Sequence, residues 1–322
     1  MTKPTPADAE PSRDGAGPAG RPAPDADDVP RHTLPWWTRA ARRVRLSVAK
    51  RLVSPRTRRA GRFIPGLRAW SQRVERGLER TRVTVCGAPF RIDLRRRSVS
   101  RSIYLGGRWH EHVIAMLHAQ LRPGMTMADV GANVGLMAVH AGEAVGPAGI
   151  VLAFEPEARN FALLEENARH ARARNIVPIA AAVGERDGTI DLFVSARDGG
   201  DHRTVAAPDA RPAIRVPLVS LDEEARRRGV TVNFAKLDIQ GAEGQALRGM
   251  RATMRAQAFS GLVIEFWPDT LRAAGEDPLA LLAEIRGAGL SCASHPALER
   301  DPAAFVASIE RGGACDLLFV RN

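Results

Sequence analysis

The feature that most constrains the fold is a pair of short sequences, Ala-Asp-Val-Gly-Ala-Asn-Val-Gly at 128–135 and Phe-Glu-Pro at 154–156. Apolar residues before the first sequence predict a strand, and its two glycines predict a tight turn that leads into a helix. A second apolar run predicts a strand that ends at Glu155. An acid at the tip of the second strand of such a unit is well placed to accept both hydroxyls of a ribose. The pair therefore predicts a site for an adenosine-bearing cofactor.

The spacing of the turn favours S-adenosylmethionine over a dinucleotide. Dinucleotide sites prefer Gly-x-Gly-x-x-Gly, which brings a helix N-terminus to a pyrophosphate. Here a carboxylate precedes the first glycine, and it would repel a pyrophosphate but suit a cationic amino-acid moiety. The alternatives are NAD and an ordinary turn with a capping Asp or Asn. We assign Glu155 to the ribose, and the methionine end and its loop to four residues: Asp129, Gly131, Asn133 and Gly135.

Strands and helices alternate along the rest of the chain, after a hairpin at 83–92. This alternation predicts an α/β fold with a mostly parallel sheet and helices on both faces. Ser220 and Glu223 form the sequence signature of a capping box and predict a short helix. The predicted strands are 126–130, 149–154, 176–180, 189–194, 233–238, 261–266, 290–294 and 315–320, and the predicted helices are 111–121, 134–144, 158–172, 242–257 and 278–287.

The positive charge of the chain is concentrated near its N-terminus. Residues 1–30 predict a disordered tail, residues 31–82 hold sixteen basic and two acidic side chains, and residues 83–322 hold 28 of each. The pattern of residues 36–53 predicts a cationic amphipathic helix, which suits a membrane surface or an acidic partner. A solvated basic linker is the alternative, and nucleic acid is a third possibility, although base-stacking aromatics are not interleaved through the segment. The neutral remainder is not expected to bind nucleic acid specifically. The apolar stripe of the helix comprises Trp37, Ala41, Val44, Val48 and Leu52.

Composition indicates a cytoplasmic protein, or one peripheral at the membrane surface. No apolar run reaches the roughly 18–20 residues that cross a bilayer. No secretory signal is visible, and the three cysteines are scattered, which is typical of a reducing compartment. No metal site is expected, because His110 and His112 lie two apart on a predicted helix and should point in different directions.

Lys236 is the most unusual residue of the predicted sheet, since strands covered on both faces are normally apolar throughout. A buried ammonium needs a partner, and Asp238 shares its face of the strand. We predict a polar catalytic cluster of Lys236, Asp238 and Glu243 beside the methyl donor; a structural ion pair is the alternative. Candidate bases are Asp238, Glu265 and His202, which lies in a loop expected to cap the substrate.

Several ordered pieces of sequence resemble the FkbM-type methyltransferases. The resemblance spans roughly residues 83–267. It implies a class I methyltransferase fold, which we expect over residues 81–322. Residues 1–80 lie outside the resemblance, and their composition predicts a basic, partly helical extension over 31–80. That fold has a seven-stranded sheet whose last strand is antiparallel. The matching pieces are Asp129-Val-Gly-Ala-Asn-Val-Gly135, Ala153-Phe-Glu-Pro156, Ala180-Ala-Ala-Val-Gly184, Val216-Pro-Leu-Val-Ser-Leu-Asp222, Lys236-Leu-Asp-Ile-Gln-Gly-Ala-Glu243 and Leu262-Val-Ile-Glu265.

The resemblance implies S-adenosylmethionine as cofactor and O-methylation of a hydroxyl on a small metabolite, sugar or glycan. Gly184 and the alanines before it are expected to border the adenine. A methyltransferase acting on RNA or protein is the first alternative, although a neutral domain lacks the basic face that RNA needs. A non-catalytic domain that binds the cofactor for an interaction is the second, and a dehydrogenase is a distant third.

Overall fold

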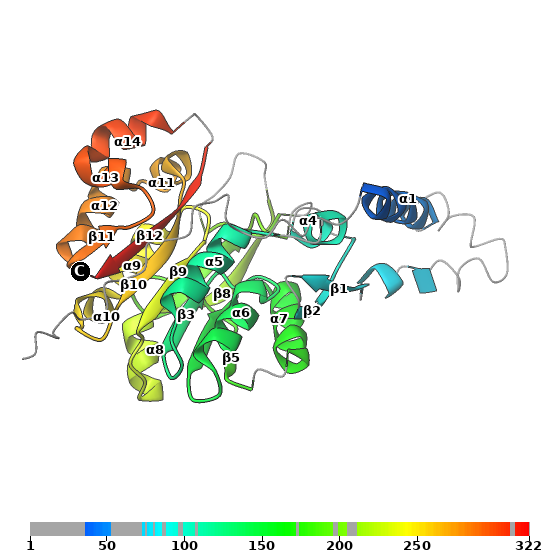
Figure 1. Cartoon of the computed structure of the whole chain (residues 1–322), viewed down its shortest axis with the longest axis horizontal. Helices are drawn as coiled ribbons and strands as arrows, with labels where there is room; N and C mark the ends of the chain where they lie inside the picture. Colours follow the sequence, from blue (N-terminus) through cyan, green and yellow to red (C-terminus); the bar gives the residue numbers. More distant parts are fainter. Residues whose placement is uncertain are drawn as a thin grey trace, which may run out of the picture.

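The computed structural model describes most of the chain from residue 36 onward (Figure 1). The predicted tail at 1–30 lies outside the described residues, as do 53–72 of the basic extension. No helix of the described part is long and apolar enough to cross a membrane. The described residues are 36–52, 73–74, 76–79, 81–85, 88–95, 99–106, 109–171, 174–195, 199–204, 211–309 and 313–321.

A seven-stranded sheet forms the centre of the molecule, in the order β11-β12-β10-β9-β3-β4-β5. β12 is antiparallel to both of its neighbours, and the other pairs are parallel. The predicted seven-stranded, mostly parallel sheet with an antiparallel last strand is confirmed. The strands are β3 (Thr126–Val130), β4 (Ile150–Phe154), β5 (Ile176–Ile179), β9 (Phe234–Leu237), β10 (Gly261–Phe266), β11 (Leu290–Cys292) and β12 (Cys315–Arg321).

Helices cover both faces of this sheet (Figure 1). Alternate strand residues enter two separate cores, with Met127 and Val151 in one and Ala128 and Leu152 in the other. The first core is closed by α5 (Glu111–Gln120), α6 (Leu136–Val145) and α7 (Ala158–His170). The second is closed chiefly by α8 (Leu221–Arg228), α9 (Glu243–Arg248), α10 (Arg251–Arg255) and α12 (Pro278–Gly287), with α11 (Pro268–Ala273), α13 (Pro296–Arg300) and α14 (Pro302–Ser308) nearby.

Smaller elements lie outside the central sheet. The predicted hairpin is present as β1 (Thr81–Val85) and β2 (Ala88–Ile92). The strand predicted at 189–194 is β7 (Gly188–Phe193), but it belongs to a separate sheet with β6 (Ala182–Val183) and β8 (Ala213–Val219). β8 was not predicted, because a proline such as Pro217 is unusual inside a strand. The side chains of β8 are also largely exposed. Two further helices, α1 (Trp36–Leu52) and α4 (Val99–Gly106), pack together.

The helix predicted over 242–257 is wrong, since it is divided into α9 and α10 at Gly249 and Met250. The division is stabilised from outside the segment. The carboxylate of Asp222 accepts backbone N–H bonds from Ala252 and Thr253, at 2.9 and 2.8 Å, and so caps the first turn of α10. A tertiary cap of this kind is invisible to the local periodicity that predicted one helix.

Candidate active site

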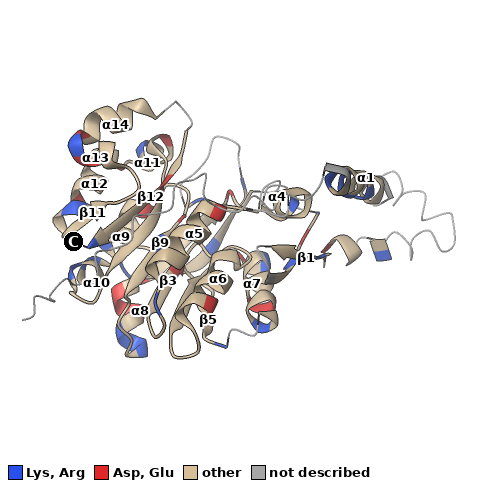
Figure 2. Cartoon of the chain, in the orientation of Figure 1, with Lys and Arg blue, Asp and Glu red and all other residues tan. Residues whose placement is uncertain are grey.

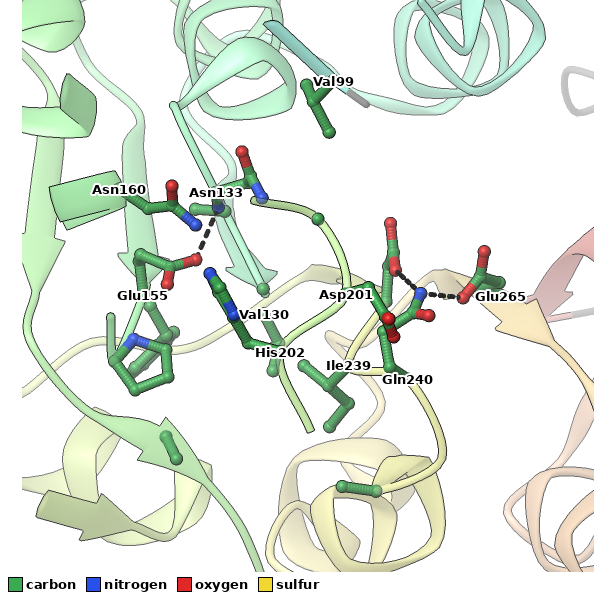
Figure 3. A pocket seen from close by; sticks show the side chains of 18 of the residues that line it. Val99, Val130, Asn133, Glu155, Asn160, Asp201, His202, Ile239, Gln240 and Glu265 are labelled. Carbon is green, nitrogen blue, oxygen red and sulfur yellow. Dashed lines mark hydrogen bonds between the residues drawn. The ribbon is translucent and has the colours of Figure 1, made fainter. Parts of the chain in front are cut away.

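A cavity of about 420 Å³ opens at the carboxyl ends of β3, β4, β9 and β10 (Figure 3). Ligands of open α/β sheets bind at this edge. Seven of the eleven residues predicted for the site line the cavity: Gly131, Asn133, Glu155, His202, Lys236, Asp238 and Glu265.

The turn between β3 and α6 is held by main-chain contacts. Gly131 and Ala132 donate their N–H groups to the carbonyl oxygen of Phe154 at the tip of β4, at 3.1 and 2.9 Å. Gly131 has a φ of +79°, and a Cβ there would collide with the carbonyl oxygen of Asp238. Only glycine therefore fits where the ends of β3 and β9 touch.

Glu155 is buried at the end of β4 and faces the cavity. One carboxylate oxygen accepts the N–H of Asn133 (Figure 3) and the other accepts the N–H of Glu157, both at 2.9 Å. Burial raises the pKa of Glu155 to about 7, although these two bonds favour the ionised form. Each oxygen keeps a second lone pair, so the carboxylate can also accept the two hydroxyls of a ribose.

Three residues predicted to bind the cofactor do not line the cavity. Asp129 is fully buried behind it, with one carboxylate oxygen 3.4 Å from the ammonium of Lys236. Gly135 has a φ of +88° and lies so close to Leu164 that a Cβ would approach that side chain to 2.7 Å. Gly184 packs against β8, while the three residues before it line the cavity. These glycines serve the fold around the site.

Lys236 links the turn after β3 to the end of β9 at the bottom of the cavity. Its ammonium donates to the carbonyl oxygen of Gly131 at 3.0 Å and lies 3.5 Å from a carboxylate oxygen of Asp238. Burial alone would lower the pKa of Lys236, but Asp238 and Asp129 outweigh burial and raise it above its usual value. The side chain is therefore a fixed cation, and the ion pair that we considered as the structural alternative is present within the site.

A second carboxyl group, that of Glu265 at the end of β10, lies beside Asp238 in the cavity lining. The amide nitrogen of Gln240 bridges the two, at 3.1 Å from Asp238 and 2.6 Å from Glu265 (Figure 3). Burial, and then the charge of Asp238, raise the pKa of Glu265 to about 9. Burial would also raise the pKa of Asp238, but Lys236 lowers it below its usual value. At neutral pH Asp238 is ionised and Glu265 is protonated.

Glu243, predicted as a third member of the catalytic cluster, lies behind the turn after β9. Its carboxylate accepts the N–H groups of Ile239 and Gly241, at 3.0 and 2.9 Å, and does not line the cavity. Burial raises the pKa of Glu243 to about 7. The structure therefore gives Glu243 a positioning role, in which it fixes the turn that carries Asp238 and Gln240.

The prediction that His110 and His112 point in different directions is wrong. His110 precedes α5 in a left-handed conformation, with a φ of 48°, so the helical spacing does not apply. The two rings stack with centroids 5.6 Å apart, and His110 also stacks on Trp109 at 4.9 Å. A carboxylate oxygen of Asp316 lies 2.5 Å from Nε2 of His112 and 3.8 Å from Nδ1 of His110. Trp109 and His110 line the cavity.

Residues 199–204 line one wall of the cavity, as predicted for the capping loop. The carbonyl oxygen of Gly199 accepts two side-chain amides, from Asn133 at 2.7 Å and Asn160 at 2.8 Å. His202 accepts the N–H of Ser195 through Nδ1 at 3.1 Å, which fixes its ring beside Glu155 (Figure 3). Sequence reasoning missed Asn160, whose only signal was an amide in the first turn of α7.

The far end of the same segment meets a tryptophan that the sequence did not single out. The guanidinium of Arg203 lies 5.7 Å from the ring centroid of Trp267, the residue before α11. Arg203 also pairs with Asp201 at 2.7 Å. Within the described part of the chain, no group of three or more His, Cys, Asp or Glu side chains is arranged to hold a metal ion.

Comparison with known families identifies the domain around this cavity. The family described as Methyltransferase FkbM domain matches residues 129–290, which is half of the chain. The chain belongs to the FkbM methyltransferase family. Its activity is therefore S-adenosylmethionine-dependent methyl transfer, and the matched residues include the turn after β3, Glu155 and Lys236.

Solved structures similar to this FkbM-family chain have low sequence identity to it, and no curated protein matches it. A SAM-dependent methyltransferase from Aquifex aeolicus is 16% identical, with a TM-score of 0.35, over 65% of this chain and 87% of that one. TYW2 from M. jannaschii, solved with AdoMet, is 11% identical, with a TM-score of 0.38, over 76% and 87%. Fibrillarin from Aeropyrum pernix, with natively bound S-adenosyl-L-methionine, is 15% identical, with a TM-score of 0.38, over 65% and 74%.

Proposed function

We propose that the chain methylates a hydroxyl group of a small metabolite, sugar or glycan. The observation that carries the proposal is the pair of carboxyl groups at one end of the cavity, Asp238 ionised and Glu265 protonated, joined by the amide of Gln240. Such a pair offers a proton acceptor and a proton donor to neighbouring hydroxyls of one molecule.

The opposite end of the cavity fits S-adenosylmethionine. Glu155 supplies the acceptor for the ribose hydroxyls, and the apolar side chains of Phe154, Ala182 and Val183 suit an adenine ring. The carboxylates of Glu155 and Asp238 also favour a ligand with positive charge. When bound, the cofactor supplies a methyl group already activated by a sulfonium.

The residues of the chain supply orientation and proton transfer. Asp238 accepts the proton of the acceptor hydroxyl, and Lys236 keeps that carboxylate ionised until the acceptor arrives. Glu265 donates to a neighbouring oxygen, and Gln240 fixes both carboxyl groups. Residues 199–204 exclude water from the reacting groups, which raises the strength of every polar contact inside.

An RNA acceptor fits this cavity less well. The ionised carboxylate of Asp238 lines it together with Glu155, and negative charge repels phosphates. Residues 83–322 also carry no net charge, whereas RNA recognition relies on a basic face.

The proposal is tested by offering the full chain methyl-labelled S-adenosylmethionine with matched acceptors. One set consists of polyhydroxylated sugars and alcohols, and the other of their amino analogues, a basic peptide and an RNA hairpin. We expect label to appear as a methyl ether in the first set only, and S-adenosylhomocysteine to suppress it. Transfer to the peptide or the RNA, with none to any hydroxyl compound, would refute the proposal while leaving methyl transfer intact.

A further inference from the structure

α1 packs on the domain through one side only. Leu46 is 4% exposed and Ala49 packs beside it. The guanidinium of Arg42 donates to the carbonyl oxygen of Tyr104 in α4 at 2.6 Å and lies 5.2 Å from the centroid of that ring. This side of the helix is therefore occupied by α4.

The opposite side of α1 is apolar and open to solvent. Val44 is 63% exposed and Val48 is 50% exposed, and they are the two most exposed large hydrophobic residues of the described chain. Ala41, one turn before Val44, is exposed as well. These three residues are the centre of the predicted apolar stripe, so this centre faces away from the domain.

Basic residues are spread along α1 (Figure 2). Arg39, Arg43 and Arg45 are exposed, and the sequence of α1, WWTRAARRVRLSVAKRL, contains no acidic residue. Arg39 lies seven residues before buried Leu46, so helical spacing places it on the side that packs on the domain. We name the surface formed by Ala41, Val44, Val48, Arg43 and Arg45 the outward face of α1.

We propose that the outward face of α1 docks on the surface of an anionic lipid bilayer. A helix that carries both exposed apolar side chains and a fringe of arginines matches the two layers of such a surface, acyl chains below and anionic headgroups above. A soluble polyanion such as RNA would pair with the arginines but would leave Val44 and Val48 in water. The apolar centre therefore favours lipid.

Docking at this face would bring the active site near the membrane. α4 contacts α1, and Val99 at the start of α4 lines the cavity. The helix on the bilayer is thus separated from the acceptor site by a single helix, a position that suits acceptors carried at a membrane surface.

The test is vesicle flotation with the full chain, on neutral phosphatidylcholine and on phosphatidylcholine containing phosphatidylglycerol. We expect binding to the anionic vesicles only, and a fall of about tenfold or more in the partition of the double variant Val44→Gln, Val48→Gln, because two apolar side chains lose their burial. Ile214→Gln is the matched control, since Ile214 is 40% exposed on β8 and lies outside the outward face.

A double variant, Arg43→Gln and Arg45→Gln, tests the charge. Its binding to anionic vesicles should fall by at least tenfold and lose most of its sensitivity to salt. Equal partition of the double valine variant and the parent chain would overturn the proposal. So would binding to RNA or polyglutamate without partition onto any vesicle, which would assign the face to a soluble polyanion.

Discussion

The two ends of the cavity are built in different ways. At the end assigned to the cofactor, the side chains of Glu155 and Asn133 are tied to the main chain, by hydrogen bonds to backbone N–H and carbonyl groups. At the other end, Asp238, Glu265 and Lys236 act mainly on one another, through charge and through the amide of Gln240. The first end has a fixed geometry, while the second has a protonation state that depends on its neighbours.

A substitution at Asp238 should separate the two ends of the cavity by the largest effect. We expect Asp238→Asn to lower kcat by about 10²–10⁴-fold, the usual contribution of a general base, and to leave the Kd for S-adenosylmethionine within a few-fold. The measurement is steady-state kinetics together with calorimetric titration of the cofactor. Asp191→Asn, on the exposed surface of β7, is the control. A loss of cofactor affinity as large as the loss of kcat would move Asp238 to the cofactor end.

The converse change is Glu155→Gln. We expect the Kd for S-adenosylmethionine to rise about thirtyfold, since hydrogen bonds to a charged group contribute about 1.5–3 kcal/mol, and kcat at saturation to change little. Glu243→Gln is a closely matched control. Both glutamates are buried, accept two backbone N–H groups and have a pKa near 7, but only Glu155 lines the cavity. Equal cofactor affinity in the two variants would show that Glu155 only holds its turn.

A smaller effect should follow from loosening the covering segment. Asn160→Ala removes one of the two amides on the carbonyl oxygen of Gly199, and we expect KM for the acceptor to rise about fivefold, the value of one hydrogen bond. Asn175→Ala is the control, because its amide bonds carbonyl groups of α6 and its C-cap, away from the cavity. If the cofactor Kd rises and KM for the acceptor does not, the segment belongs to the cofactor end.

The smallest expected effect is the change in the free energy of unfolding with pH that results from Glu265. An acid whose pKa is higher in the folded chain binds its proton more tightly when folded, so stability falls as the pH rises toward that pKa. For Glu265 the pKa moves from 4.5 to about 9. Between pH 7 and 9 the free energy of unfolding should fall by up to about 1.4 kcal/mol per pH unit, the value for one proton.

Denaturant unfolding at several pH values checks this slope. Glu265→Gln should remove most of it, leaving the smaller fall that comes from His112, whose pKa Asp316 raises. Glu243→Gln should keep the slope, because Glu243 titrates near pH 7 in the folded chain, at the lower limit of this range. An unchanged slope in Glu265→Gln would contradict the protonated state assigned to Glu265.

The same contrast explains what the sequence could predict. The cofactor end lies on two consecutive strands and one turn, so Gly131, Asn133 and Glu155 stand close together in the sequence and were recognised. The other end is assembled from two segments, β9 with its following turn and the end of β10. Lys236 and Asp238 were singled out because charge is anomalous in a buried strand, and Glu265 was named only as a separate candidate base, because its pairing with Asp238 depends on β9 and β10 becoming neighbours.

Misplaced elements have similar causes. The division between α9 and α10 depends on Asp222, thirty residues away in the chain. The contact of His110 with His112 depends on a left-handed residue before α5. The roles of Gly135 and Gly184 were misjudged because a glycine needed for close packing looks the same in a sequence as one needed beside a ligand. The alternation of strands and helices, in contrast, is local and was predicted well.

The attachment of the covering segment has a consequence for how the acceptor site can change. The side-chain amides of Asn133 and Asn160 donate to the carbonyl oxygen of Gly199. This is a main-chain group, which every amino acid possesses. Residues 201–204 can therefore be exchanged without loss of this anchor, and the cofactor turn that carries Asn133 is untouched by the exchange. Substitutions in residues 201–204 can therefore change the selectivity for the acceptor while the methyl donor site stays constant.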